Sequence, residues 1–272
     1  MNNKYIYLII FLICLSCIYN YYNTIEHMTQ DKPHKNIMSL TKPINTDWSE
    51  CWNELDHKAR KGDNCNPISR DYTKLGTIDT WIWVMPTSCE NGMPHTRGVD
   101  IIAMPENFSK TQMAKTLEHE KIHLLQKRNP DIWKQFYSKY WNYEIYNLPP
   151  SNMPKELIEM KRANPDTADE PYNCWQNNWW AVPVYKSVDN LNFRGSPVLW
   201  WDQSIDQIYN HPPKEWVDFF GTHVAQAEHP HEISAVYIAN WLFNKDNIQK
   251  TEALKRLVKK YDFKLEKLKY LV

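Results

Sequence analysis

The five residues His119-Glu120-Lys121-Ile122-His123 place two histidines four positions apart, with a glutamate directly after the first. Residues four apart lie on one face of an α-helix, so both imidazoles can bind a single zinc ion if this segment is helical. Glu120 then lies where it can take a proton from a water molecule on that ion. The alternative is a pair of surface histidines on an amphipathic helix. The motif requires a helix here and a third ligand from elsewhere in the chain.

The residues around the motif favour this helix. Ser109 and Gln112 form an S-x-x-Q pattern that predicts a capping box, and Asn129-Pro130 ends the run. Just upstream, residues 98–105 are β-branched and bounded by glycine and proline, which predicts a strand. Apolar residues recur near helical spacing between these limits, at Met113, Leu117, Leu124 and Leu125.

A strand followed by a helix that carries H-E-x-x-H resembles the zincin metallopeptidases. The resemblance covers roughly 30 residues around the motif. It implies a zinc-dependent hydrolase that cleaves peptide bonds, with His119 and His123 as zinc ligands and Glu120 as general base. It also implies a zincin-like domain of two lobes, with a small mixed sheet beside the active-site helix.

The branches of this superfamily differ in their third zinc ligand. The metzincin branch needs Gly and His where this chain has Gln126 and Asn129, and the aspzincin-like pattern needs Asp where it has Ala225. The remaining arrangement is gluzincin-like, in which a glutamate on a later helix completes the site. The best candidate is Glu232, which follows His229-Pro230-His231, although 109 residues separate it from His123.

Three other residues remain open as the third ligand, namely Glu228, His229 and Glu170. The assignment of Glu232 requires its carboxylate to lie within about 4–5 Å of both imidazoles.

A donor is also needed for the oxyanion that develops on the substrate carbonyl. His223 is the choice for this role, because it lies in a Gly-led loop before the ligand helix. The alternatives are His231, Tyr237 and Tyr185.

The N-terminal residues predict a membrane anchor. Residues 5–19 are nearly all apolar, with one lysine before them and a polar segment after them. We expect residues 1–23 to form an uncleaved signal anchor, or a signal peptide if they are cleaved. We expect residues 24–46 to form a stalk and residues 47–272 to form the catalytic domain. This places the domain on the non-cytosolic side of a membrane, or secretes it after cleavage.

The number of cysteines is consistent with a domain that folds in an oxidising compartment. Four of the six lie outside the apolar segment, which allows two disulfides in three connectivities. We expect Cys51–Cys65 and Cys89–Cys174. The alternative is that these cysteines are buried and reduced.

The order of predicted elements indicates an α+β fold with lobes over about 47–146 and 147–272. Strands are expected over 80–85, 99–104, 179–187 and 196–202. Helices are expected over 48–60, 130–146, 154–162, 213–220, 231–243 and 248–271, besides the motif helix.

Composition and charge limit the partners. The 32 basic and 32 acidic residues balance, so no global field points to nucleic acid. The expected partners are a peptide or protein substrate and the membrane. Two alternatives remain, a non-catalytic binding protein on a zincin scaffold, surface- or particle-associated, and an unrelated tryptophan-rich recognition module.

Overall fold

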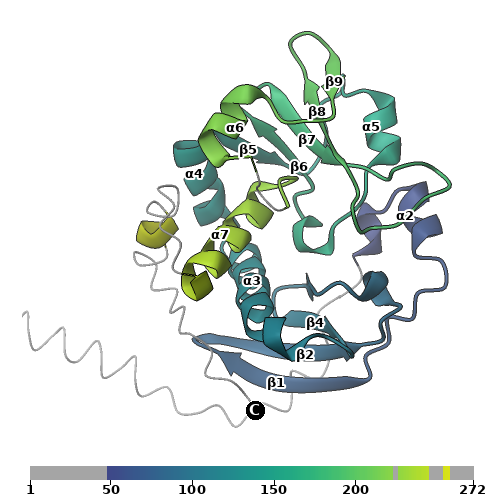
Figure 1. Ribbon diagram of the computed structural model, residues 1–272, viewed down its shortest axis with the longest axis vertical. Helices are drawn as coiled ribbons and strands as arrows, with labels where there is room; N and C mark the ends of the chain where they lie inside the picture. Colours follow the sequence, from purple (N-terminus) through teal and green to yellow (C-terminus); the bar gives the residue numbers. More distant parts are fainter. Residues whose placement is uncertain (1–47, 223–225, 245–253, 258–272) are drawn as a thin grey trace, which may run out of the picture. The chain divides into compact units, whose positions relative to one another are not determined.

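The computed structural model describes residues 48–222, 226–244 and 254–257 (Figure 1). The described residues form an α+β structure with two sheets, which confirms the expected fold class. No helix among them is long and apolar enough to cross a membrane. The expected anchor over 1–23, the stalk over 24–46 and most of the expected helix over 248–271 lie outside these residues, as does His223.

The first sheet supports the motif helix. Its strand order is β1-β2-β4-β3, with β2 and β4 parallel and the other pairs antiparallel. Strand β4 is buried along its whole length, whereas most of β1 is exposed. The strands are β1 Ser69–Leu75, β2 Ile78–Met85, β3 His95–Arg97 and β4 Ile101–Pro105. The sequence predicted β2 and β4, which carry the apolar residues, and not β1 and β3.

Helix α3, Lys110–Arg128, follows β4 and carries the motif. Ser109 is its N-cap residue, but the Ser109 hydroxyl lies 2.8 Å from that of Thr111 and makes no cap bond. The predicted capping box is therefore wrong. Helix α3 ends at Asn129, as expected, because Pro130 begins α4.

Helix α4, Pro130–Trp141, is shorter than the sequence predicted. Asn142 adopts a left-handed conformation with φ 56°, and its N–H bonds the Tyr137 carbonyl, which ends the helix. The next four residues form β5, Tyr143–Tyr146, which pairs with β6. Pairing across the second sheet thus replaces the last turn of the expected helix.

The second sheet is antiparallel throughout, in the order β5-β6-β7-β8-β9. Four of its tryptophans are buried, namely Trp175, Trp180, Trp200 and Trp201. They therefore fill the core. The remaining strands are β6 Tyr172–Trp175, β7 Trp179–Pro183, β8 Val198–Asp202 and β9 Gln207–Tyr209.

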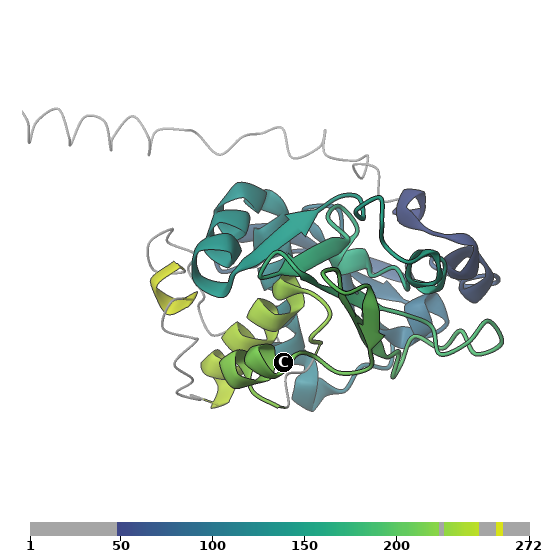
Figure 2. The same cartoon turned by 90° about the horizontal axis from the view of Figure 1, so that it is seen from above.

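Helix α7, Pro230–Asn244, packs along α3 between the two sheets (Figures 1 and 2). Ala235 and Ala239 of α7 are buried, and small side chains allow this close approach. One apolar core joins α3, α4, α7 and both sheets. The other helices are η2 Ser49–Cys51, α2 Glu54–Ala59, η3 Cys89–Gly92, α5 Lys155–Met160, η4 Pro165–Thr167 and α6 Lys214–Phe220.

The disulfide joins Cys65 to Cys89, so both expected pairings are wrong. Cys65 and Cys89 pack together in a small cluster beside the first sheet. Cys174 is buried in a separate cluster of the second sheet, and Cys51 is a free, half-buried thiol. The sequence could not rank these pairings because the partners are set by which elements pack together.

Candidate metal centre

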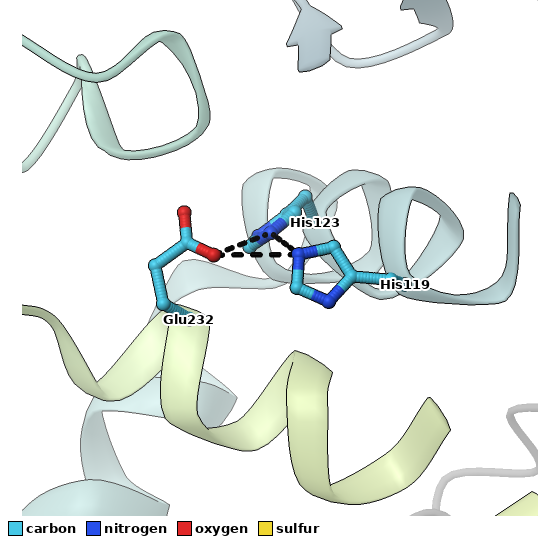
Figure 3. Close-up of side chains that lie close together, drawn as sticks. All are labelled: His119, His123 and Glu232. Atoms are coloured by element: carbon cyan, nitrogen blue, oxygen red, sulfur yellow. Dashed lines mark hydrogen bonds and ion pairs between the residues drawn. The ribbon is translucent and has the colours of Figure 1, made fainter. Parts of the chain in front are cut away.

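Three side chains from two helices converge on one point, namely His119, His123 and Glu232 (Figure 3). The histidines lie one turn apart on α3, and Glu232 lies in the first turn of α7. The two Nε2 atoms are 3.0 Å apart, and each lies 3.3 Å from Glu232 Oε2. The packing of α7 against α3 therefore brings together residues that are far apart in the sequence.

These separations fit one small metal ion. Tetrahedral ligands at 2.0–2.1 Å from zinc lie about 3.3–3.4 Å apart, close to the spacing of the three atoms. His123 and Glu232 are fully buried, whereas the His119 side chain is 14 % exposed. Two imidazoles and a carboxylate form a donor set that zinc accepts, with its open side toward His119.

Gln126 fixes the orientation of His123. Its Oε1 lies 2.8 Å from His123 Nδ1, while its Nε2 donates to the Tyr137 hydroxyl, the His231 carbonyl and the Ser234 hydroxyl. Because the His231 carbonyl can only accept, the amide nitrogen must face it, and Oε1 then accepts from Nδ1–H of His123. When the ring is neutral, Nε2 of His123 is then the unprotonated nitrogen that a metal requires.

Asn164 fixes the orientation of Glu232. Its Nδ2 donates to Glu232 Oε1 over 2.8 Å, which leaves Oε2 directed at the imidazoles. Burial favours the neutral acid, but His123 and His119 hold the pKa of Glu232 well below its usual range. Burial likewise opposes charge on His123, yet Glu232 and Asp166 raise the pKa of His123 to about 10. The carboxylate is therefore ionised and ready to bind a cation.

Glu120 lies beside these three residues and is buried. Burial raises the pKa of Glu120 well above its usual value, and the negative charges of Asp166 and Glu232 raise it further. Glu120, His123 and Asp166 form a second group of potential ligands. Because Gln126 engages His123 Nδ1, both groups would use His123 Nε2, so they are alternatives for one ion. Asp166 Oδ1 already accepts two hydrogen bonds of 2.7 Å from Thr96.

A cleft of about 930 Å³ opens beside His119 and Glu120. Its walls come from η3 and β3, the N-terminal half of α3, the loop containing η4, the loop before β8, and α7 with the residues before it. Both polar and apolar side chains line it, including Phe108, Phe193, Val236 and Arg162. Its size suits a segment of peptide or another small ligand.

The other candidates for the third ligand are engaged elsewhere. Glu228 pairs with Arg162 at 3.2 Å, and Glu170 pairs with Lys134. His229 Nε2 lies 3.0 Å from the Glu170 carbonyl, and its Nδ1 accepts from the backbone N–H of His231. The structure thus brings Glu232, and none of these three, to the two histidines.

The candidates for the oxyanion donor do not converge on the cleft. The Tyr237 hydroxyl donates to the Phe220 carbonyl, and the Tyr185 hydroxyl donates to Asp56. The His231 ring is buried against Tyr137. Burial holds the pKa of His231 well below its usual value. Since His223 lies outside the described residues, its role stays a prediction.

Sequence reasoning missed three residues that support the site, namely Gln126, Asn164 and Asp166. Gln126 stands three positions after His123, a helical spacing that could have identified it. Asn164 and Asp166 belong to the loop containing η4, whose position depends on the tertiary fold.

Comparison of the chain with protein-family models, with curated proteins and with solved structures gives no match.

Proposed function

We propose that this protein is a zinc-dependent peptidase of gluzincin-like arrangement, with one catalytic zinc on His119, His123 and Glu232. The observation that carries the proposal is the 3.0–3.3 Å triangle of their ligand atoms beside a buried glutamate and a cleft. The spacing and donor set support zinc over larger, oxygen-preferring ions.

When bound, zinc would make a coordinated water molecule more acidic and polarise the substrate carbonyl. Glu120 would receive the proton at its carboxylate and pass it to the leaving amine. Burial favours this role, because the raised pKa of Glu120 brings the carboxylate closer to the basicity that proton transfer at neutral pH requires. The cleft would hold the peptide with its scissile carbonyl next to His119 and Glu120.

We also propose that the domain acts on the non-cytosolic side of a membrane, held there by the apolar segment over 5–19. The Cys65–Cys89 disulfide supports this location, since such bonds persist in oxidising compartments.

The test of function is peptide hydrolysis by the zinc-loaded full chain, assayed against a broad peptide library by mass spectrometry. Glu120→Gln should keep the zinc and lose at least about 100-fold in kcat/KM, because it cannot accept a proton. Glu156→Gln, at an exposed position of α5, is the control and should keep full activity.

The alternative function is a metal-binding scaffold without catalysis. A wild-type chain that binds zinc but cleaves no peptide of the library would reject the peptidase and favour this alternative. Cleavage that is equal in wild type and Glu120→Gln would reject the role of Glu120.

A further inference from the structure

A second cavity, of about 530 Å³, shares Pro165 of its lining with the cleft beside the metal centre. It is lined by the segment around η2 and α2, by β3, the loop after β5, the end of α5, the loop containing η4, and the beginning of β6. Neither the three candidate ligands nor Glu120 line it. The residues important to its chemistry are Trp48, Trp52, Lys127, Lys161 and Tyr172.

Lys161 differs from the other buried cations. Arg60 pairs with Asp56 and Glu90, Arg162 pairs with Glu228, and Lys121 pairs with Glu118. Lys161 is only 6 % exposed, yet within residues 48–222, 226–244 and 254–257 its ammonium has no hydrogen-bond acceptor. Its Nζ lies over the Tyr172 ring, 5.1 Å from the ring centroid.

The Lys161 side chain is buried but lines the cavity, so its ammonium can bind a ligand that supplies the missing acceptor. Burial lowers the pKa of Lys161, and the negative charge of Asp56 only partly opposes this. Asp56 is already committed, because its Oδ1 accepts from Arg60, Tyr185 and the backbone of Ala163. Asp56 Oδ2 accepts from the backbone N–H of Asn53, so other donors engage both oxygens of this neighbouring acid.

The position of Lys161 is fixed by its backbone. The Asn53 amide donates to the carbonyls of Ile158, Glu159 and Lys161, which anchors the end of α5 to the start of α2. Lys127 lines the same cavity, but its ammonium donates to the carbonyls of Pro165 and Thr96. The two other acids of the lining, Glu50 and Asp169, are exposed. Arg97, the third cation of the lining, donates to His95 and Cys89. Among the three cations of the lining, Lys161 is therefore the one without a hydrogen-bond acceptor in the described residues, and it lies against the Tyr172 ring.

We propose that this cavity binds a small organic carboxylate, whose charged group pairs with Lys161 and whose apolar body lies among Trp48, Trp52 and Tyr172. A carboxylate supplies the acceptor that Lys161 lacks, and a charge-assisted hydrogen bond of this kind is stronger than a neutral one. The aromatic residues of the lining favour a ligand with an apolar body, since such rings bury large contact areas. The site is separate from the metal centre and does not depend on hydrolysis.

The probe pair is benzoate and benzamide, which share a shape and differ in charge. Isothermal titration calorimetry with the full chain should show benzoate binding at least about tenfold more tightly than benzamide. Lys161→Met should remove this preference and weaken benzoate at least tenfold, while Lys161→Arg should retain it. Lys155→Met is the control, because Lys155 is an exposed lysine of α5.

Equal affinity for the two probes, or benzoate binding that survives Lys161→Met, would overturn the proposal. Inorganic phosphate is tested alongside, and phosphate binding in place of benzoate would overturn the assignment to an organic carboxylate. If Lys161→Met fails to fold, 19F NMR of the fluorotryptophan-labelled wild-type chain tests whether benzoate binds in this cavity. Benzoate must then shift the resonances identified by Trp48→Phe and Trp52→Phe, and unchanged resonances would reject the site.

Discussion

Gln126 holds the His123 ring in a single tautomer, since its Oε1 lies 2.8 Å from His123 Nδ1 while its amide nitrogen donates to three other acceptors. The glutamine that excludes one branch of the zincins by sequence thus supports the metal centre in the fold. Its bonds reach α4 and α7, so it also connects α3 to the helix that carries Glu232.

Gln126→Met should weaken zinc binding by about 10- to 100-fold, because methionine keeps the volume and loses the bond to His123. The measurement is competition for zinc against a chromophoric chelator. Gln112→Met, at an exposed position in the first turn of α3, is the control and should bind as the wild type does. Equal zinc affinity for Gln126→Met and the wild type would show that Gln126 has only a packing role.

Removal of the Cys65–Cys89 disulfide should lower the free energy of unfolding by about 3 kcal/mol, because the bond closes a loop of 24 residues in the unfolded chain. Urea unfolding of the wild type and of Cys65→Ser, each with and without reductant, measures this loss. Cys174→Ser should remain sensitive to reductant, since Cys174 is a free thiol. A wild-type chain whose stability is unchanged by reductant would contradict the pairing.

The stability of the metal-free chain should fall as the pH is lowered from about 6.5 toward 4, in part through His95, because burial also lowers the pKa of His229 and His231. His95 is buried, with Nδ1 2.9 Å from the Met93 carbonyl and Nε2 accepting from Arg97. Burial, reinforced by the charge of Arg97, lowers the pKa of His95 to about 4. Since the unfolded chain binds the proton first, the contribution of His95 is complete above pH 6.5 and is lost on acidification.

The expected loss from His95 is at most about 3 kcal/mol between these pH values. Urea unfolding at a series of pH values should show a smaller slope for His95→Gln than for the wild type. His211→Asn replaces an exposed histidine and should keep the wild-type slope. An unchanged slope in His95→Gln would reject His95 as the source of the pH dependence.

Local sequence predicted the helices and strands whose own residue spacing favours that secondary structure. Helix α3 and strands β2 and β4 carry apolar residues at the spacing of their own structure, and Pro130 marks the end of α3. Strand β1 is mostly exposed and polar, so only its pairing with β2 makes it a strand. The aromatic residues of β5 fit a helix or a strand equally well, and the left-handed Asn142 decides between them.

The residues of the candidate site also divide into those that a local pattern predicts and those that only the fold brings together. His119, Glu120 and His123 are set by helical spacing, and Glu232 was found through the proline that begins its helix. Asn164 and Asp166 contribute through contacts across the fold, which no local pattern records. The Cys65–Cys89 pairing was missed for the same reason.

The most direct test of the metal centre is the zinc content of the purified full chain after chelation and reloading, measured by inductively coupled plasma mass spectrometry. Wild type and Glu120→Gln should each hold about one zinc per chain, the number that a single closed ligand set binds. His119→Ala, His123→Ala and Glu232→Gln should hold almost none. A wild-type chain without zinc, or ligand variants that bind as much zinc as the wild type, would contradict the account.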